Sequence, residues 1–225
     1  MEKKLIFAFL YILLFPALLF LLAGDWEWRE AWVFAIWLIV LSYTTIAYLY
    51  RKDPALLAER YRKPGTGNQE PWDRYAVYGI IVGFMVWIAI MPLDAKRFGW
   101  SPPFPLWLQF LGVAGLAGSF FFFFRSYTDN TFLSPLVRIQ EDRRQTVVST
   151  GVYRFVRHPM YLGGVLMFLG TPLLLGSIYG TIAGLALTVL LMVRIIGEEA
   201  MLSRELEGYR DYCRKVRFRL LPFVW

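Results

Sequence analysis

Long runs of apolar residues, separated by short polar segments, dominate the chain. Because about 20 apolar residues in a helix are needed to cross the hydrocarbon core of a bilayer, each run predicts a membrane-spanning helix. Six spans are predicted: Leu5–Ala23, Ala31–Tyr50, Tyr75–Leu93, Phe104–Phe124, Pro159–Gly176 and Ile178–Ile196. The last two are joined by almost no loop and form a closing helical hairpin. We therefore expect an all-α, polytopic membrane protein with about six transmembrane helices.

The spans divide the chain into two regions that we expect to pack as one structural unit. Residues 1–124 form a four-helix transmembrane region, and residues 125–225 hold a polar loop, the hairpin and a cytoplasmic tail. The first span follows Lys3 and Lys4, as a signal peptide would, but its apolar run is long and no small-x-small cleavage site follows. We therefore interpret it as an uncleaved span.

The distribution of basic residues predicts the orientation in the membrane. Of the 24 Lys and Arg residues, 21 lie before the first span, in 51–74, in 125–158, or from Arg194 to the end. Cytoplasmic loops carry such an excess, so both termini and the polar loops are expected in the cytoplasm. The net charge of +7 then reflects topology and contact with anionic lipid rather than nucleic acid. The short outer loops favour a bacterial or archaeal plasma membrane over the endoplasmic reticulum.

Composition excludes several other classes of protein. The chain is 57% hydrophobic and 18% charged, whereas soluble domains carry about 25% charged residues. A single cysteine excludes a disulfide scaffold, and a single histidine, His158, excludes a zinc site built from Cys and His. We expect no metal.

Two polar clusters flank the closing hairpin. One leads into the fifth span and contains His158, Pro159 and Tyr161; the other ends the sixth span and contains Arg194 and Glu198. Proline suits the first helical position, so His158 is expected at the N-cap of a helix whose free N–H groups face the cytoplasm. Spans of about 18 residues are each about 27 Å long at 1.5 Å per residue, so the hairpin returns to its starting level. His158 and Tyr161 should therefore face Arg194 and Glu198.

Each of these residues also has a purely structural interpretation. An arginine at a helix end commonly reaches for the interface, a Glu-Glu pair is commonly solvated, and a histidine before proline is commonly only a cap. The residues alone thus predict a polar site at a membrane surface. A transporter or scaffold that binds an anion is a further alternative, although we find neither the internal repeat nor the charged spans that transporters often carry.

The spacing of these clusters resembles the isoprenylcysteine carboxyl methyltransferase family and the related phospholipid methyltransferases. The matching pattern is Gly151-x-Tyr153-x-x-x-Arg157-His158-Pro159-x-Tyr161-x-Gly163, then Arg194-x-x-x-Glu198-Glu199-x-x-Leu202, then Gly208-Tyr209-x-x-Tyr212. It covers about residues 140–222 and is far more specific than a lone short motif. The first four spans match only in being apolar.

The resemblance implies an enzyme that transfers a methyl group from S-adenosylmethionine. The residues that it implies for cofactor binding are Gln140, Gln145, Thr146, Val147, Val148, Tyr153, His158, Pro159, Met160, Tyr161 and Glu198. The family often has His where this chain has Gln145. Arg194 corresponds to the arginine that binds the substrate carboxylate; we expect Arg194 and Glu198 to be catalytic, and Arg194 and Glu199 to bind substrate.

The acceptor is expected to be amphipathic, since a site at the membrane rim admits a lipid tail from the bilayer. A carboxylate, as in an isoprenylcysteine-like molecule, is already ionised at pH 7 and needs only orientation, which an arginine provides. A phospholipid amine or a small thiol must lose a proton, which would make Glu198, Glu199 or His158 a base. These acceptors remain open, as does the oligomeric state. No nucleic-acid partner is expected.

Overall fold

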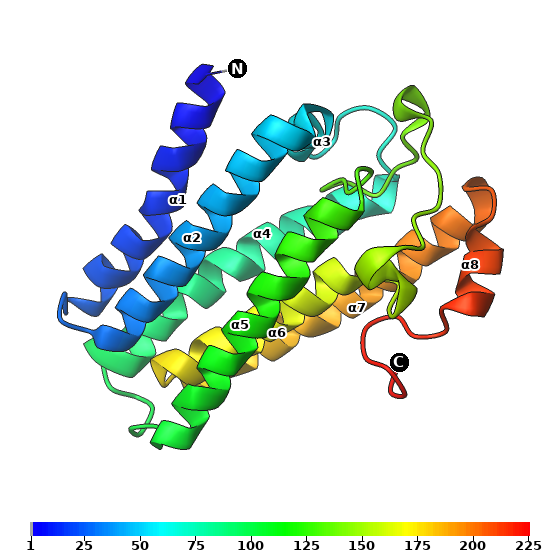
Figure 1. The fold of residues 1–225 in the computed structure, drawn as a ribbon. Coiled ribbons are helices and arrows are strands. Elements are labelled where there is room, and N and C mark those ends of the chain that lie inside the picture. The colour runs from blue at the N-terminus through cyan, green and yellow to red at the C-terminus, as the bar shows by residue number, and fades with distance from the viewer. Residues whose placement is uncertain (1) are drawn as a thin grey trace.

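The computed structural model describes residues 2–225, with the side chains of residue 10 and residues 12–225. The described residues form helices joined by loops, with no β-strand among them. The long helices are α1 (Glu2–Ala23), α2 (Arg29–Lys52), α4 (Pro71–Pro92), α5 (Leu106–Asp129), α6 (Pro159–Leu175) and α7 (Ile178–Glu205). They lie side by side in one bundle (Figure 1).

Shorter elements gather at one end of the bundle. They are α3 (Pro54–Arg60), the 3₁₀ turns η2 (Glu141–Arg143) and η3 (Gly151–Arg154), and α8 (Tyr209–Lys215). Figure 1 shows α3, α8 and the connection from α5 to α6 at the same end. A π-helical turn, η1 (Leu93–Arg97), continues α4 at the opposite end.

Each predicted span lies on one of the long helices, which confirms the expected fold class. By length and composition, α2, α4 with η1, α5 and α7 are long and apolar enough to cross a membrane. Helix α6 (Pro159–Leu175) is apolar but shorter. The part of α1 whose side chains are described, Ile12–Ala23, is apolar as well. The boundaries differ by a few residues at most ends, and the largest difference is at α7, which continues past Ile196 to Glu205. Helix α5 begins at Leu106, with Pro105 at its N-cap, and ends at Asp129.

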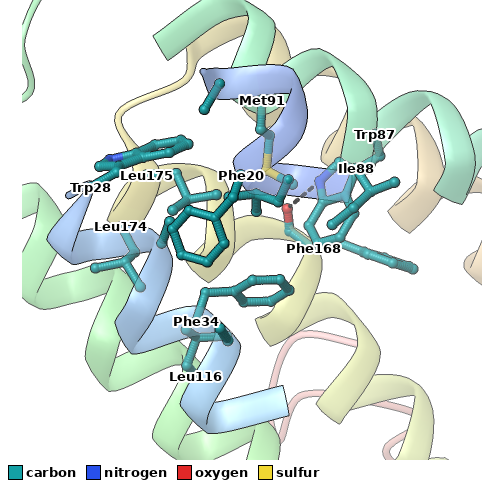
Figure 2. Packing of buried hydrophobic residues seen from close by; sticks show 14 of the residues in the cluster. Phe20, Trp28, Phe34, Trp87, Ile88, Met91, Leu116, Phe168, Leu174 and Leu175 are labelled. Carbon is teal, nitrogen blue, oxygen red and sulfur yellow. Dashed lines mark hydrogen bonds between the residues drawn. The ribbon is translucent and has the colours of Figure 1, made fainter. Parts of the chain in front are cut away.

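Large apolar side chains hold the helices together at the centre of the bundle. Phe20, Phe34, Trp87, Leu116 and Phe168 come from α1, α2, α4, α5 and α6, and each is at most 4% exposed. The indole of Trp87 also donates a hydrogen bond of 3.2 Å to the Phe168 carbonyl (Figure 2). One core therefore connects both halves of the chain.

Helices α5 and α6 approach so closely that their contact needs glycine. A Cβ atom on Gly112 would lie 2.4 Å from the backbone nitrogen of Leu174, and one on Gly170 would lie 3.0 Å from the Gly112 carbonyl oxygen. Small residues allow such backbone contact between membrane helices. The crossing fixes α6, and with it the start of the hairpin, against α5.

The end of the bundle that carries η1 is tied together by the buried carboxylate of Asp94. Its Oδ2 accepts hydrogen bonds from the hydroxyls of Ser177 at 2.6 Å and Ser101 at 2.7 Å. The N–H of Tyr179, in the first turn of α7, donates to the same oxygen at 3.2 Å. Asp94 thus fastens the end of α4 to the start of α7.

Candidate active site

The closing hairpin returns to its starting level, as expected, and a cavity of about 320 Å³ lies beside its open end. His158 is the N-cap of α6 and Pro159 its first residue. The predicted site residues that line the cavity are Gln145, Thr146, Val147, Val148, Tyr153, His158, Pro159, Met160, Tyr161, Arg194 and Glu198. Small-molecule sites span about 300–1,000 Å³, so this cavity suits a compact ligand.

Arg194 is held in place from three directions. Its Nε donates to Asp73 Oδ1 at 2.7 Å, its Nη2 to the Pro135 carbonyl at 2.8 Å, and its Nη1 to the Tyr161 hydroxyl at 3.0 Å. A guanidinium has five N–H donors, so two remain for a ligand in the cavity. Asp73 is itself fully buried and accepts from Gln69 Nε2 and the Val137 N–H. The arginine is therefore oriented before any ligand binds.

Tyr161 bridges the two residues predicted to be catalytic. Its hydroxyl donates to Glu198 Oε2 at 2.5 Å and accepts from Arg194. Arg194 and Glu198 share a face of α7, as the spacing of four indicates, yet no direct ion pair joins them among the described residues. The other oxygen of Glu198 has no hydrogen-bond partner within the part of the chain that the structure describes. It is thus available to a ligand.

Glu199 lies in a separate cluster of charges behind the cavity wall. Its carboxylate accepts from Arg157 Nε at 2.6 Å and Arg219 Nε at 2.7 Å, and its Oε1 lies 3.1 Å from His158 Nε2. Glu199 does not line the cavity, although its partners Arg157 and His158 do, so these two side chains lie between its carboxylate and the cavity. The expectation that His158 faces Arg194 and Glu198 is wrong in this respect: its ring nitrogen faces Glu199, and only Tyr161 meets the other two.

The same cluster fastens the C-terminal segment to the start of α6. The N–H of Arg157 donates to the Phe218 carbonyl and that of His158 to the Arg219 carbonyl, each at 2.9 Å. Arg157 Nη1 also donates to the carbonyls of Val216 and Arg217, each at 2.7 Å. The arginine that precedes the predicted histidine therefore secures the chain beyond α8.

Gln140 supports the cavity wall without reaching the cavity. Its side chain is 1% exposed and donates to the Phe132 carbonyl at 2.5 Å, and its backbone N–H donates to Gln145 Oε1 at 2.8 Å. Through these contacts Gln140 hydrogen-bonds to other residues of its own loop, whereas Gln145 lines the cavity.

A buried ion pair anchors this loop to α3. Arg138 donates from Nε and Nη2 to the two oxygens of Glu59, each at 2.9 Å, and both side chains are 3% exposed. Burial alone raises the pKa of the Glu59 carboxyl, but hydrogen bonds from Arg138, Ser134 and Arg62 outweigh it and lower the pKa to about 2. Glu59 is therefore charged at neutral pH and holds residues 134–138 beside the cavity.

Tyr153 lines the cavity, but its hydroxyl is enclosed by the protein. The hydroxyl lies near Asn130 and Ser126, and the Tyr153 carbonyl accepts from the Tyr212 hydroxyl at 2.6 Å. Burial raises the pKa of the Tyr153 hydroxyl far above its usual value, so it stays protonated. Tyr153 therefore presents its ring, rather than its hydroxyl, to the cavity.

An apolar groove of about 750 Å³ lies next to the cavity, on the side of α1, α2 and α5. Its walls are mainly aliphatic and aromatic, and include Trp37, Leu41 and Leu49 of α2. The residues that line both spaces are Arg60, Phe123 and Met167. A polar cavity and an apolar groove thus lie side by side among the membrane helices.

Comparisons with known proteins find methyltransferases among the proteins that this chain resembles. The family model described as phospholipid methyltransferase matches residues 107–207, from α5 to just beyond α7. The protein-S-isoprenylcysteine O-methyltransferase of Schizosaccharomyces pombe is 35% identical over 85 residues, which are 37% of this chain and 36% of the relative. The predicted resemblance is confirmed.

The family model covers less than half of the chain. The chain aligns with only about a third of the length of the yeast relative. The solved structure of a eukaryotic isoprenylcysteine carboxyl methyltransferase, described as an intramembrane Ras methyltransferase, is 20% identical over all of this chain and 87% of that one, with a TM-score of 0.48.

The structure adds residues that the sequence pattern did not single out. Asp73 and the Pro135 carbonyl orient Arg194, and Arg60 stands where the cavity meets the groove. The only signal for Asp73 was an acidic residue immediately before a membrane span, a costly position that invites a functional explanation. Nothing in the sequence pattern pointed to Pro135 or Arg60.

Proposed function

We propose that the protein is an integral-membrane methyltransferase that uses S-adenosylmethionine and methylates a lipid-like acceptor, with a carboxylate as the preferred nucleophile. The observation that carries this proposal is the linked set Asp73–Arg194–Tyr161–Glu198 at the wall of a cavity that lies next to an apolar groove. Arg194 and Glu198 are the residues to which we assign catalysis.

The residues of the cavity fit the cofactor chemically. A sulfonium is attracted by a carboxylate, and Glu198 has one oxygen without a partner in the described chain. Val147 and Val148 offer apolar contact to a base ring, and the ring of Tyr153 adds an aromatic wall. We assign cofactor binding to the predicted residues that line the cavity, with Gln140 as their support. When bound, the cofactor supplies an electrophilic methyl group on sulfur.

Arg194 would orient the acceptor. Its two unused N–H groups can hold one carboxylate oxygen while the other attacks the methyl carbon. An acceptor carboxylate has a pKa of about 4 and is ionised at pH 7, so no proton has to move. Catalysis then depends mainly on alignment of nucleophile, methyl group and sulfur. Asp73 would keep the guanidinium from turning toward bulk water.

Glu199 is a weaker candidate for substrate binding than Arg194. Its carboxylate already has three cationic or imidazole partners and does not line the cavity. An indirect contribution through His158, which does line the cavity, fits these contacts better.

A phospholipid amine is the second candidate acceptor, because the matching family model is described as phospholipid methyltransferase. An amine must lose a proton, and the unpartnered oxygen of Glu198 is the available base. The rate of amine methylation should then rise with pH, whereas the rate with a carboxylate acceptor should not.

We place the active site and both termini on the cytoplasmic side.

Calorimetric titration of S-adenosylmethionine into detergent-purified protein tests the proposal. Wild type should bind at micromolar concentration, and Glu198→Ala should lose binding. Glu205→Ala, a change of the same kind at the end of α7 where the carboxylate only pairs with surface Arg204, should bind as wild type. Absence of binding by folded wild type would overturn the proposal and favour an anion-binding transporter or scaffold.

A transfer assay with a radiolabelled donor then separates the acceptors. We would offer farnesylcysteine, phosphatidylethanolamine and a small alkyl thiol to wild type and to Arg194→Ala. A carboxylate acceptor requires that only farnesylcysteine is labelled and that Arg194→Ala abolishes labelling. Labelling of phosphatidylethanolamine alone would replace this acceptor with the amine.

A further inference from the structure

Arg60 occupies the junction between the polar cavity and the apolar groove. It is the last residue of α3 and lines both spaces. Its guanidinium carbon lies 5.3 Å from the centre of the Tyr127 ring, a cation–π contact that holds the side chain over α5. The position is therefore defined by packing.

Arg60 has no ion pair among the described side chains. Arg62 and Arg138, by contrast, are both paired with Glu59. The side chain of Arg60 is partly buried and borders both spaces, so its guanidinium can pair with an anionic group that lies between them.

The backbone that carries Arg60 is fixed at both ends of α3. Asp53 caps the helix by accepting from the Leu56 N–H at 2.9 Å, and Glu59 is held by Arg138. Leu56 and Leu57 are buried against Leu49 of α2. These contacts hold the helix against α2 and the loop.

We propose that Arg60 binds an anionic group of an amphiphilic acceptor, a phosphate or a carboxylate other than the one that Arg194 orients, while the alkyl chain lies in the groove. The lining of the two spaces supports this arrangement, because Arg60 borders the apolar groove as well as the polar cavity. The identity of this ligand as the methyl acceptor rests on the proposed function. The binding of an anionic amphiphile does not.

Binding of three matched decyl compounds tests the proposal without turnover. Decyl phosphate, decanoate and decanol would be titrated calorimetrically into the full chain in a neutral maltoside detergent. Wild type should prefer one or both anions to decanol. Arg60→Gln should weaken anion binding about tenfold, as expected for loss of a charge-assisted hydrogen bond, and leave decanol unchanged. The anion whose affinity falls more in Arg60→Gln shows whether Arg60 prefers a phosphate or a carboxylate.

Two further variants separate recognition from structure. Arg60→Lys keeps the charge and should retain part of the preference for anions. Arg51→Gln removes the same charge from an exposed position on α2 that lines neither space, and should behave as wild type. Unchanged anion binding in Arg60→Gln would overturn the proposal, as would an equal loss for decanol, which indicates a collapsed groove.

The same samples distinguish this inference from the proposed function. If wild type fails to bind S-adenosylmethionine yet loses its anion preference in Arg60→Gln, the methyltransferase proposal fails and the Arg60 site stands. If wild type binds S-adenosylmethionine but shows no preference for anions over decanol, the Arg60 proposal fails and the methyltransferase proposal stands.

Discussion

Asp73 and Arg194 form a buried ion pair of 2.7 Å although 121 residues separate them in the chain. Asp73 stands in the first turn of α4 and Arg194 in α7, so the pair joins the N-terminal region to the closing hairpin. The orientation of the predicted substrate arginine is therefore set from outside the segment that carries the family resemblance.

Asp73→Asn should lower kcat by about 10- to 100-fold, because the guanidinium loses its charged anchor at Nε. Cofactor binding should persist, since Glu198 is untouched. Initial rates and calorimetry measure the two effects. Glu70→Gln is the matched control: it removes a neighbouring carboxylate whose partner, Arg204, is 60% exposed, and it should keep full activity. Normal kcat in Asp73→Asn would contradict this role.

Tyr161→Phe removes the hydroxyl that bridges Arg194 and Glu198 but keeps the ring. We expect methyl transfer to fall by about tenfold or more with little change in thermal unfolding, because one well-aligned polar contact to each partner is lost. Tyr78→Phe, at an exposed position of α4, serves as comparison. Equal activity of both variants would show that the bridge is dispensable.

Acid should weaken the anchor between α3 and the loop. The pKa of Glu59 is about 2 in the folded protein against an ordinary value of 4.5. Its contribution to stability is therefore complete above about pH 4.5 and is lost as the pH falls toward 2. We expect the difference in unfolding temperature between wild type and Glu59→Gln to shrink over this range. A constant difference down to pH 2 would rule out this linkage.

Gly112→Ala should destabilise the bundle by about 1–3 kcal/mol, because its new methyl group meets backbone atoms of Leu174 and Gly170 that cannot turn aside. Gly118→Ala, on the same helix, meets only the Leu166 side chain at 3.1 Å and should be tolerated better. Thermal unfolding of both variants in detergent makes the comparison. Equal unfolding temperatures would show that α5 and α6 separate at little cost.

The sequence predicts the helices well because membrane spans depend on local composition alone. It also predicts that Tyr161 meets Arg194 and Glu198, since the lengths of α6 and α7 determine where the hairpin returns. It cannot predict which face of each helix turns inward. For that reason His158 was expected to face Glu198, whereas it meets the adjacent Glu199.

Contacts between distant segments are a second limit. Asp73, Pro135 and Arg60 belong to segments whose placement depends on tertiary packing, and no local pattern relates them to the hairpin. Glu199 and Gln140 show the same limit from the other side. The family resemblance predicts that both contact a ligand, but neither lines the cavity. Their side chains bond to other parts of the protein instead, among them Arg219 and Phe132.

Asp94 gives a mechanical consequence for the whole bundle. It ties the end of α4 to the start of α7, while Asp73 and Arg194 tie the same two helices together at the opposite end. A sliding or rocking movement between α4 and α7 would have to break both attachments at once. The loop of residues 134–138 belongs to the same frame, because Pro135 bonds to Arg194 and Val137 to Asp73. Entry of a ligand into the cavity is therefore expected to displace α1 and α2, with α4 and α7 as the stationary frame.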